Sequence, residues 1–382
     1  MKRIKSFNGE RLSLARVFRG ITVADLAEKI GVKRQMISLY EGNKVEPESD
    51  RVFLMSKALD FPFSFFYEQD LSEVKIARST YFRSLLTTNK KYRNEQTAKI
   101  EMICRIYSFL SEYVSFPKIN LPSIDEYSDY EEAAVALRKC WNLAERPIEN
   151  IIKLCEDNGI IVSAYYTSSD TIDAFSKSLE IDGVTRYTIA LSKNKNTAAR
   201  IHFDVAHELG HILLHEWNED IESLSPDEFR QKEKEANNFA AAFLMPKEAF
   251  ICDFENYAGK LNYYYQMKKK WKVSIAAMIY RSWFLGLIDY DTYQSLMRKM
   301  QKLGIRKNEP FDDILTTAKP SILCSAVNLL FDEGVFTPSE FVNEMSCENL
   351  SLYPKDIEEL LCLPEGTLND NSGKPNISIK LL

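Results

Sequence analysis

The amino-acid sequence predicts an α+β protein that is mostly helical and is divided into four parts. Up to residue 67, short helical patterns separated by glycines predict a helical bundle. Residues 68–128 predict a helical linker, and residues 129–304 combine helical patterns with the strand-like runs of a small sheet. The C-terminal region, 305–382, reads as short helices with turns and has no assigned role. A chain of 382 residues exceeds the usual size of one hydrophobic core, so several domains are expected.

Composition places the chain among soluble globular proteins. Hydrophobic residues make up 45% and charged residues 27% of the sequence, and no apolar run approaches the length of a membrane span. The start of the chain carries no apolar signal core, so we expect a cytoplasmic protein without a membrane partner. The seven cysteines form no Cys-x-x-Cys pair, which argues against a disulfide framework and against a thiolate zinc site.

Three short helices are expected near the start of the chain. The first runs from Arg11 to Arg19 and ends at a glycine. Thr22 then caps a second helix, Val23 to Ile30, and another glycine separates it from a third, Lys33 to Tyr40. Two short helices joined by a glycine-containing turn are typical of a helix-turn-helix. The exposed side of the third helix is expected to carry Lys33, Arg34, Gln35, Ser38 and Leu39.

The stretch "TVADLAEKIGVKRQMISLYEGNK" resembles the phage-repressor-like (Xre) helix-turn-helix family, and the resemblance covers roughly residues 8 to 67. It implies double-stranded DNA as a partner, with Arg34, Gln35 and Ser38 near base edges and Lys33 at a phosphate. Residues 1–44 carry ten Lys or Arg and four Asp or Glu, a net charge of +6, whereas the whole chain carries −6. A positive segment suits a polyanion. The alternative is a small bundle used only for dimerisation or partner docking.

A long amphipathic helix is expected from Asn94 to Tyr113, in the linker. One side of it carries Ile100, Ile103, Ile106, Leu110 and Tyr113. We expect this side to be buried within the same chain, because the pattern lasts too few heptads for a coiled coil; a homodimer stays open. Helices are then expected near Tyr130–Asn142 and Ile148–Asp157. Strand-like runs follow at residues 160–166, 174–179 and 186–191.

All four histidines lie within "IHFDVAHELGHILLHEW", residues 201–217. His207 and His211 are four residues apart, so they share one helix face with Glu208 beside them. This is His-Glu-x-x-His, in which two imidazoles bind Zn²⁺ and the Glu takes a proton from the attacking water. On a continuous helix His215 lies two turns from His207, too far for the same ion, so we place it and Asp204 beside the site rather than on the metal; a structural role is the alternative for His215. His202 falls on the apolar side and is expected to be structural.

The third ligand is expected on the next helix, "SPDEFRQKEKEANNFAAAFLMP", which begins at the capping residues Ser225 to Asp227. Its carboxylates are Glu228, Glu233 and Glu235. Glu233 and Asn237 are four apart and share a side, so that one would bind zinc while the other steadies a histidine. A His-His-Glu set with an open position is typical of catalytic zinc.

"HELGHILLH", followed by "EKEANNFAAAFLMP" and "VSIAAMIYRSWFLGLI", resembles the ImmA/IrrE family of metallopeptidases. Together with the first 67 residues, the resemblance covers about three quarters of the chain and indicates a fused Xre-ImmA/IrrE type with a zincin-like fold. The gluzincin pattern of that family implies Glu233 as the third zinc ligand and Asn237 as its supporting neighbour. It implies that Glu208 is the general base of peptide-bond hydrolysis.

These observations predict a DNA-binding transcription regulator that cleaves a repressor, or itself, in a stress, prophage or mobile-element response. Two other readings stay open: a non-proteolytic DNA-binding regulator, and an antitoxin-like binding module, with a structural or vestigial metal site. Tyr165, Tyr166 and Arg200 are candidate oxyanion helpers. The run 174–179 is expected to be an edge strand that pairs with the substrate backbone.

Overall fold

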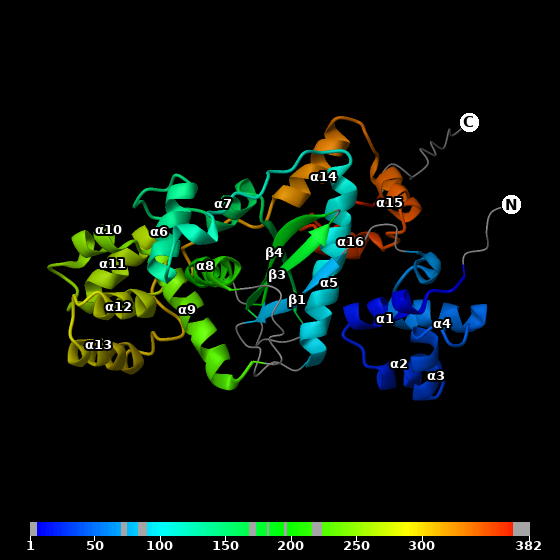
Figure 1. The fold of residues 1–382 in the computed structure, drawn as a ribbon, viewed down its shortest axis with the longest axis horizontal. Coiled ribbons are helices and arrows are strands. Elements are labelled where there is room, and N and C mark those ends of the chain that lie inside the picture. Colours follow the sequence, from blue (N-terminus) through cyan, green and yellow to red (C-terminus); the bar gives the residue numbers. More distant parts are fainter. Residues whose placement is uncertain are drawn as a thin grey trace, which may run out of the picture. The chain divides into compact units, whose positions relative to one another are not determined.

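The computed structural model of the chain describes residues 6–69, 75–82, 90–167, 173–181, 183–194, 197–215 and 224–369. These residues confirm an α+β fold that is mostly helical (Figure 1). Two compact units are formed, the first by residues 6–69, 90–115 and 321–369 and the second by residues 76–82 and 116–320 with the gaps above. None of the helices in the described ranges is long and apolar enough to cross a membrane.

The first unit contains the predicted helix-turn-helix. Thr22 caps α2 with a reciprocal capping box, and Gly31 ends that helix in the left-handed conformation, φ 68°, which favours glycine. Lys33 is the N-cap of α3. The helices of this part of the chain are α1 (Gly9–Phe18), α2 (Val23–Ile30), α3 (Arg34–Glu41), α4 (Ser49–Leu59) and the 3-10 helix η1 (Phe63–Tyr67). Their core is formed by Leu12, Leu26, Ile37, Val52 and Phe65.

The long helix α5 (Lys90–Ser111) begins four residues before the predicted start. Its predicted apolar side is buried in the first unit, except Tyr113, which follows the helix and is 39% exposed. The helices α14 (Ile322–Asp332), α15 (Pro338–Cys347) and α16 (Pro354–Leu360) belong to the same unit. Figure 1 shows α14 beside α5, and the Phe109 ring contacts Phe341 of α15 at 5.8 Å. The apolar side of α5 is therefore covered by its own chain.

Residues 321–369 are joined to α1 by ionic contacts. The Arg19 guanidinium donates two hydrogen bonds to the Asp356 carboxylate, at 2.6 and 2.7 Å, and Asp356 is buried. Arg11 donates to the backbone carbonyl of Asn349 at 3.1 Å, and both residues are buried. A bidentate arginine–carboxylate pair is strong and geometrically specific. Helix α1 is therefore attached to residues near the C-terminal end of the described chain.

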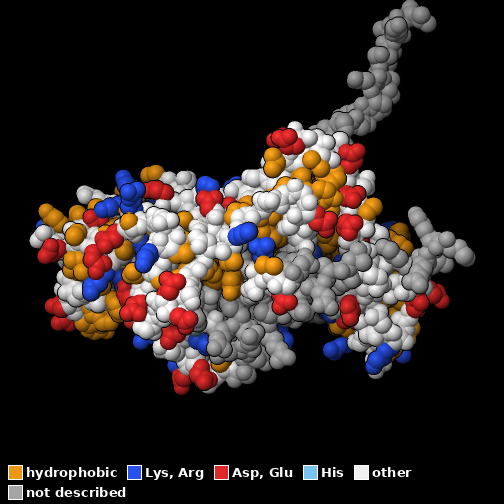
Figure 2. Space-filling view, turned by 45° about the horizontal axis from the view of Figure 1, so that its top comes forward, with side chains coloured by type: hydrophobic (Ala, Val, Ile, Leu, Met, Phe, Trp, Pro, Cys, Tyr) orange, Lys and Arg blue, Asp and Glu red, His pale blue; other side chains and the backbone are white. Residues whose placement is uncertain are grey.

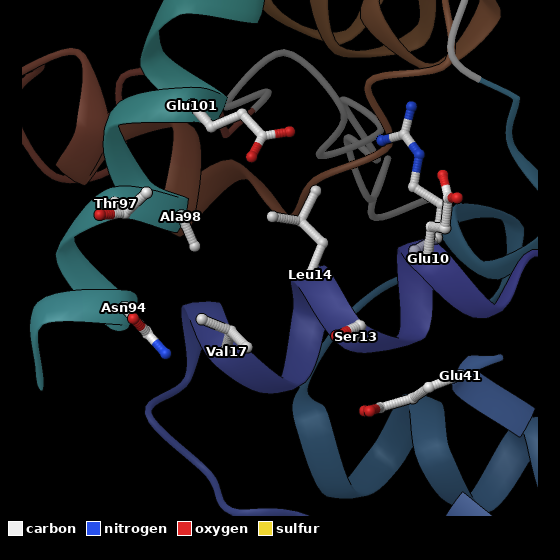
Figure 3. A pocket seen from close by; sticks show the side chains of 10 residues that line it. Glu10, Ser13, Leu14, Val17, Glu41, Asn94, Thr97, Ala98 and Glu101 are labelled. Carbon is white, nitrogen blue, oxygen red and sulfur yellow. The ribbon is translucent and has the colours of Figure 1, made fainter. Parts of the chain in front are cut away.

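A cavity of about 480 Å³ lies between α1 and α5 in the first unit. Figure 3 shows Leu14 and Val17 of α1 on one side and Ala98 of α5 on the other. Carboxylates at its border come from Glu10, Glu41 and Glu101. Leu14 is half-buried, because it borders this cavity.

The second unit contains a four-stranded sheet in the order β1-β3-β4-β2. Strand β2 (Ile161–Tyr165) pairs parallel with β4 (Val184–Ser192), and β3 (Ala174–Ile181) pairs antiparallel with β4. The prediction that residues 174–179 form an edge strand is wrong, because β1 (Lys75–Phe82) lies beside β3. The sequence of β1, KIARSTYF, is rich in β-branched and aromatic residues, but it lies in a stretch interpreted as linker.

Helices complete the second unit. They are the 3-10 helix η2 (Ile124–Glu126), α6 (Tyr130–Cys140), α7 (Ile151–Asp157), α8 (Ala198–Leu214), α9 (Pro226–Leu244), α10 (Lys247–Phe254), α11 (Leu261–Trp271), α12 (Ile275–Phe284) and α13 (Tyr290–Lys302). Helix α8 contacts α9 on one side and β3 on another, so the histidine helix lies between the sheet and the following helix. The fully buried Lys268 of α11 forms ion pairs with two carboxylates that follow α13 in the chain. These are Glu309, at 2.8 Å, and Asp312, at 2.5 Å. This pairing attaches residues 309–312 to the second unit.

Candidate metal centre and nucleic-acid interface

The histidines of the His-Glu-x-x-His motif meet on one face of α8. His207 and His211 are one helical turn apart, their Nε2 atoms are 3.0 Å apart, and both side chains are fully buried. Burial lowers the pKa of His211 to about 3, so its ring is neutral near pH 7. Neutral imidazole is the form that binds a metal. His211 is thus in the protonation state that metal binding requires, and the two rings are at the right spacing for a shared cation.

Helix α9 brings one carboxylate to these two rings. Glu233 Oε1 is 3.3 Å from His211 Nε2, and Glu233 Oε2 is 3.5 Å from His207 Nε2. A ligand atom from each of the three residues lies within 4.8 Å of the other two. Two imidazoles and one carboxylate are the donor set of catalytic zinc sites, so these residues fit the ion that the sequence predicts.

The other predicted residues of α9 face elsewhere. Glu228 forms the capping box with Ser225 that begins the helix. Glu235 Oε2 is 3.2 Å from His215 Nε2. Asn237 donates from Nδ2 to the backbone carbonyl of Glu233 at 2.7 Å, a contact with the ligand helix rather than with a histidine. Of the three carboxylates considered on this helix, Glu233 is the one placed at the histidine pair.

Gly210 permits the close approach of α9 to α8. A Cβ atom at this position would lie 3.0 Å from Ala236 Cα and 3.1 Å from the Phe239 ring. Glycine costs about 1 kcal/mol in a helix interior relative to alanine. Here it lets the backbone of α9 come near enough for Glu233 to reach the histidines. Gly210 lies inside the His-Glu-x-x-His motif, at one of its two unspecified positions, so the motif itself does not mark this residue.

His215 does not continue the helix as predicted. Helix α8 ends at Leu214, and His215 is in an extended conformation, φ −122° and ψ 143°. Its ring turns back, so that its Nδ1 is 2.9 Å from His211 Nδ1. Burial lowers the pKa of His215, and the adjacent His211 lowers it further. His215 therefore contacts the far side of a predicted ligand and links it to Glu235.

Glu208 lies beside the histidines and is itself buried, with 1% of its surface exposed. The Ser176 hydroxyl of β3 donates a hydrogen bond to Glu208 Oε2 at 2.5 Å. Ser176 is fully buried and lies 32 residues away in sequence, so no local pattern in the sequence could have identified it. The bond fixes the carboxylate of the predicted general base against the sheet.

Asp204 is buried one turn before Glu208, and its Oδ2 lies 3.7 Å from Arg200 Nε. Arg200 also pairs with Asp173, next to β3. This candidate oxyanion helper is therefore already engaged by two carboxylates. The tyrosine candidates differ from each other: Tyr165 is fully buried and Tyr166 is 65% exposed.

His202, on the other side of α8, is fully buried, and within the described residues neither ring nitrogen has a hydrogen-bond partner. Burial lowers its pKa to about 4, and Lys272 lowers it further while Glu149 opposes this. His202 therefore lies on the buried, apolar side of α8 and away from the ligand face, as the sequence predicts.

The predicted DNA-binding residues lie on the outer face of α3. Lys33, Arg34, Gln35 and Ser38 are all exposed, while Ile37 and Tyr40 on the inner face are buried. Figure 2 shows Lys and Arg side chains (blue) on the surface of the region that carries α1–α4, at the lower right. This face leaves forked donors free to reach base edges in a major groove.

Comparison with protein families agrees with these two sites. Residues 12–66 match the helix-turn-helix family, and residues 155–282 match the IrrE N-terminal-like domain of peptidase family M78. No curated protein matches the chain. The first match spans α1 to α4, and the second includes His207, His211 and Glu233. The chain therefore contains a region similar to the helix-turn-helix family and, after it, a region similar to the IrrE N-terminal-like domain of peptidase family M78, in the order that the sequence predicts.

Proposed function

We propose that the protein is a DNA-binding transcription regulator with zinc-dependent endopeptidase activity. Its substrate is a repressor protein or the chain itself, and cleavage controls a stress, prophage or mobile-element response. The observation that carries this proposal is the different placement of the side chains around α8. His207, His211 and Glu233 converge on one point, whereas Glu208 is bound by Ser176 and stands outside the ligand set.

The residues at the centre have distinct roles in the proposed reaction. Zinc, when bound, polarises the peptide carbonyl and lowers the pKa of water. Glu208 accepts a proton from the attacking water at its carboxylate and delivers it to the leaving nitrogen. Ser176 orients that carboxylate through the 2.5 Å hydrogen bond. His215 and Glu235 orient the His211 ring from behind, as second partners of metal-bound imidazoles do.

The DNA-binding half of the proposal assigns contacts on α3. We infer that Arg34, Gln35 and Ser38 approach base edges and that Lys33 holds a phosphate. Their exposure on one helix face supports this assignment.

A non-proteolytic regulator with a structural metal is the second candidate, and burial favours it. His207 and His211 are 0% exposed and Glu208 is 1% exposed, whereas a peptidase must admit a peptide. Access in the first candidate comes from the side of Glu233, whose side chain is 14% exposed and borders a cavity of about 430 Å³.

The substitution Glu208→Gln separates the two candidates. It keeps the size and hydrogen bonding of the side chain but removes its basicity. We expect retained zinc, fold and DNA binding, with cleavage of the candidate repressor nearly abolished and the repressed genes no longer induced. Zinc content, operator binding and repressor cleavage are measured on the same preparation. Intact cleavage and induction in the Gln variant would support the structural metal instead.

A further inference from the structure

A cavity lies beside the metal centre, where it can select among peptide substrates. Its volume is about 430 Å³, and it is formed by residues of α8, α9 and α12. Glu233 borders it, and the carboxylate oxygens of Glu233 lie 3.3 and 3.5 Å from the Nε2 atoms of His211 and His207. A side chain seated in the cavity therefore belongs to a residue close to the peptide bond at the metal centre.

Four residues give this cavity an apolar wall, and Asn237 and Asn238 of α9 add polar groups to it. Phe203 comes from α8, Ala241 from α9, and Ala277 and Tyr280 from α12. Two aromatic rings supply large contact surfaces, and the two alanines leave the space between them open. Burial of a large apolar side chain against such walls removes apolar surface from water and is favourable. The volume and the lining thus fit a side chain such as Phe or Leu.

The border of the cavity is positively charged. Arg230 and Lys234, four residues apart on α9, both line the cavity and are exposed. Arg230 pairs with Asp227 at the surface, where the two side chains are 69% and 89% exposed, so the pair is weak and replaceable. Lys234 has no ion-pair partner within the described part of the chain. Because the Glu233 carboxylate is turned to the histidines, the two cations set the charge met by an entering peptide.

We propose that this cavity is a specificity pocket for a large apolar side chain next to the scissile bond. The residue that follows this apolar residue in the peptide is acidic, and its carboxylate pairs with Lys234 and Arg230. The assignment rests on the proposed function, because it takes the metal centre as the place of cleavage. It adds a substrate class: peptides with a Phe-Glu or Leu-Glu step, rather than small or basic ones.

Binding tests the pocket without any cleavage. The full chain carrying Glu208→Gln is titrated with three fluorescein-labelled peptides, identical except for a central Phe-Glu, Ala-Glu or Phe-Lys, and anisotropy is measured. We expect Phe-Glu to bind about 10- to 100-fold more tightly than Ala-Glu. Phe-Lys is expected to bind more weakly than Phe-Glu, with a difference that shrinks as salt is added.

Two substitutions then change the pocket in opposite directions. Ala277→Trp fills it and should reduce the advantage of Phe over Ala to less than about threefold, while Tyr280→Ala enlarges it and should favour Trp over Phe. Lys234→Glu should reverse the preference for Glu over Lys. Val135→Trp and Lys247→Glu, at exposed positions of α6 and α10, are the matched controls and should change none of these ratios. An advantage of Phe that persists unchanged in both pocket variants overturns the assignment.

Cleavage of the same peptides by the zinc-loaded wild type separates this inference from the proposed function. If the Glu208→Gln protein binds Phe-Glu selectively through the pocket but the wild type cleaves nothing, the proposed hydrolysis is overturned; the side-chain preference of the cavity then stands as peptide binding, without a scissile bond beside it. If the wild type cleaves all three peptides equally and binding shows no preference, the peptidase stands and the pocket assignment is overturned.

Discussion

The face of α3 and the centre between α8 and α9 use their helices in opposite ways. On α3 the predicted DNA contacts are exposed side chains, while Ile37 and Tyr40 attach the helix to its domain. On α8 the chemically important side chains are buried, and each is held by another: His211 by His215, and Glu208 by Ser176. Groups on α3 stay solvated until a partner arrives, whereas those on α8 are oriented in advance.

This difference predicts how substitutions combine. The exposed side chains of α3 share no hydrogen-bond partner within the described residues, so their contributions to DNA binding should combine more nearly additively. The residues of the metal centre share partners, so their effects should be coupled. It also predicts that substitutions in one region leave the activity of the other intact, since His207 and Arg34 belong to different compact units.

The largest expected effect is loss of metal. We expect about one zinc per chain, reduced more than 100-fold in affinity by His207→Ala, His211→Ala or Glu233→Ala, because each removes a donor from the set. His215→Ala and Glu235→Ala act through His211 and should weaken zinc by about 10-fold. Zinc is measured by competition with a chelator, and operator binding is the control. An empty site in Glu235→Ala together with a full one in Glu233→Ala would show that the wrong carboxylate has been assigned.

The second effect concerns stability in acid and the buried His202. Its pKa is about 4 in the folded chain and ordinarily 6.5, so the unfolded chain takes up the proton first as pH falls. Stability present above pH 6.5 is therefore lost between pH 6.5 and 4, by about 3 kcal/mol for this residue. Urea unfolding of the wild type and His202→Leu at pH 7 and pH 4.5 measures this.

The difference in unfolding free energy between wild type and His202→Leu should shift in favour of the variant at the lower pH. Comparing the two chains removes the contributions of the other histidines, which are common to both. A difference that does not change with pH would mean that His202 is already protonated, or paired, in the folded chain.

The third effect is at Ser176. Ser176→Ala removes the hydrogen bond to Glu208 and should lower kcat by about 10- to 100-fold, as expected for a bond to a charged group, with zinc content unchanged. Ser176→Thr keeps the hydroxyl and should restore most of the rate. KM for the peptide should change little, because Ser176 positions the base and does not bind substrate. Equal losses in the Ala and Thr variants would indicate a packing defect.

The smallest effects are those of single DNA contacts. Arg34→Ala and Gln35→Ala should each cost about 1 to 3 kcal/mol and relax sequence preference, while Lys33→Ala weakens binding to all duplexes alike. Titration of operator and non-operator duplexes at two salt concentrations distinguishes these outcomes. If the wild type binds every duplex equally at moderate salt, α3 does not read an operator.

Local sequence patterns carried much of the prediction. The glycine turn and the Thr22 cap of the helix-turn-helix, and the spacing of His207 and His211, depend on neighbours within four residues. Glu233 was named on the family resemblance, and the structure places its carboxylate at the histidines. The histidine spacing rests on helical periodicity, and the turn and the cap rest on residue preferences; a sequence displays both directly.

Features that depend on distant segments were missed. Ser176 reaches Glu208 across 32 residues, and β1 lies beside β3 although about a hundred residues separate them in the chain. The end of α8 at Leu214 was not predicted, because no glycine or proline nearby marks it. Pairings of this kind are set by the topology of the whole unit, which no local pattern encodes.

The bond between Arg19 and Asp356 also has a consequence for the order of events during synthesis. These residues are 337 positions apart. At roughly 5 to 20 residues per second, a ribosome needs tens of seconds to pass from one to the other. Helices α1 to α4 leave the ribosome early, yet the partners of α1 at Asn349 and Asp356 are made only after the whole second unit. Synthesis of the first unit therefore starts before that of the second unit and ends after it. A newly made chain can complete the second unit before all segments of the first unit are present.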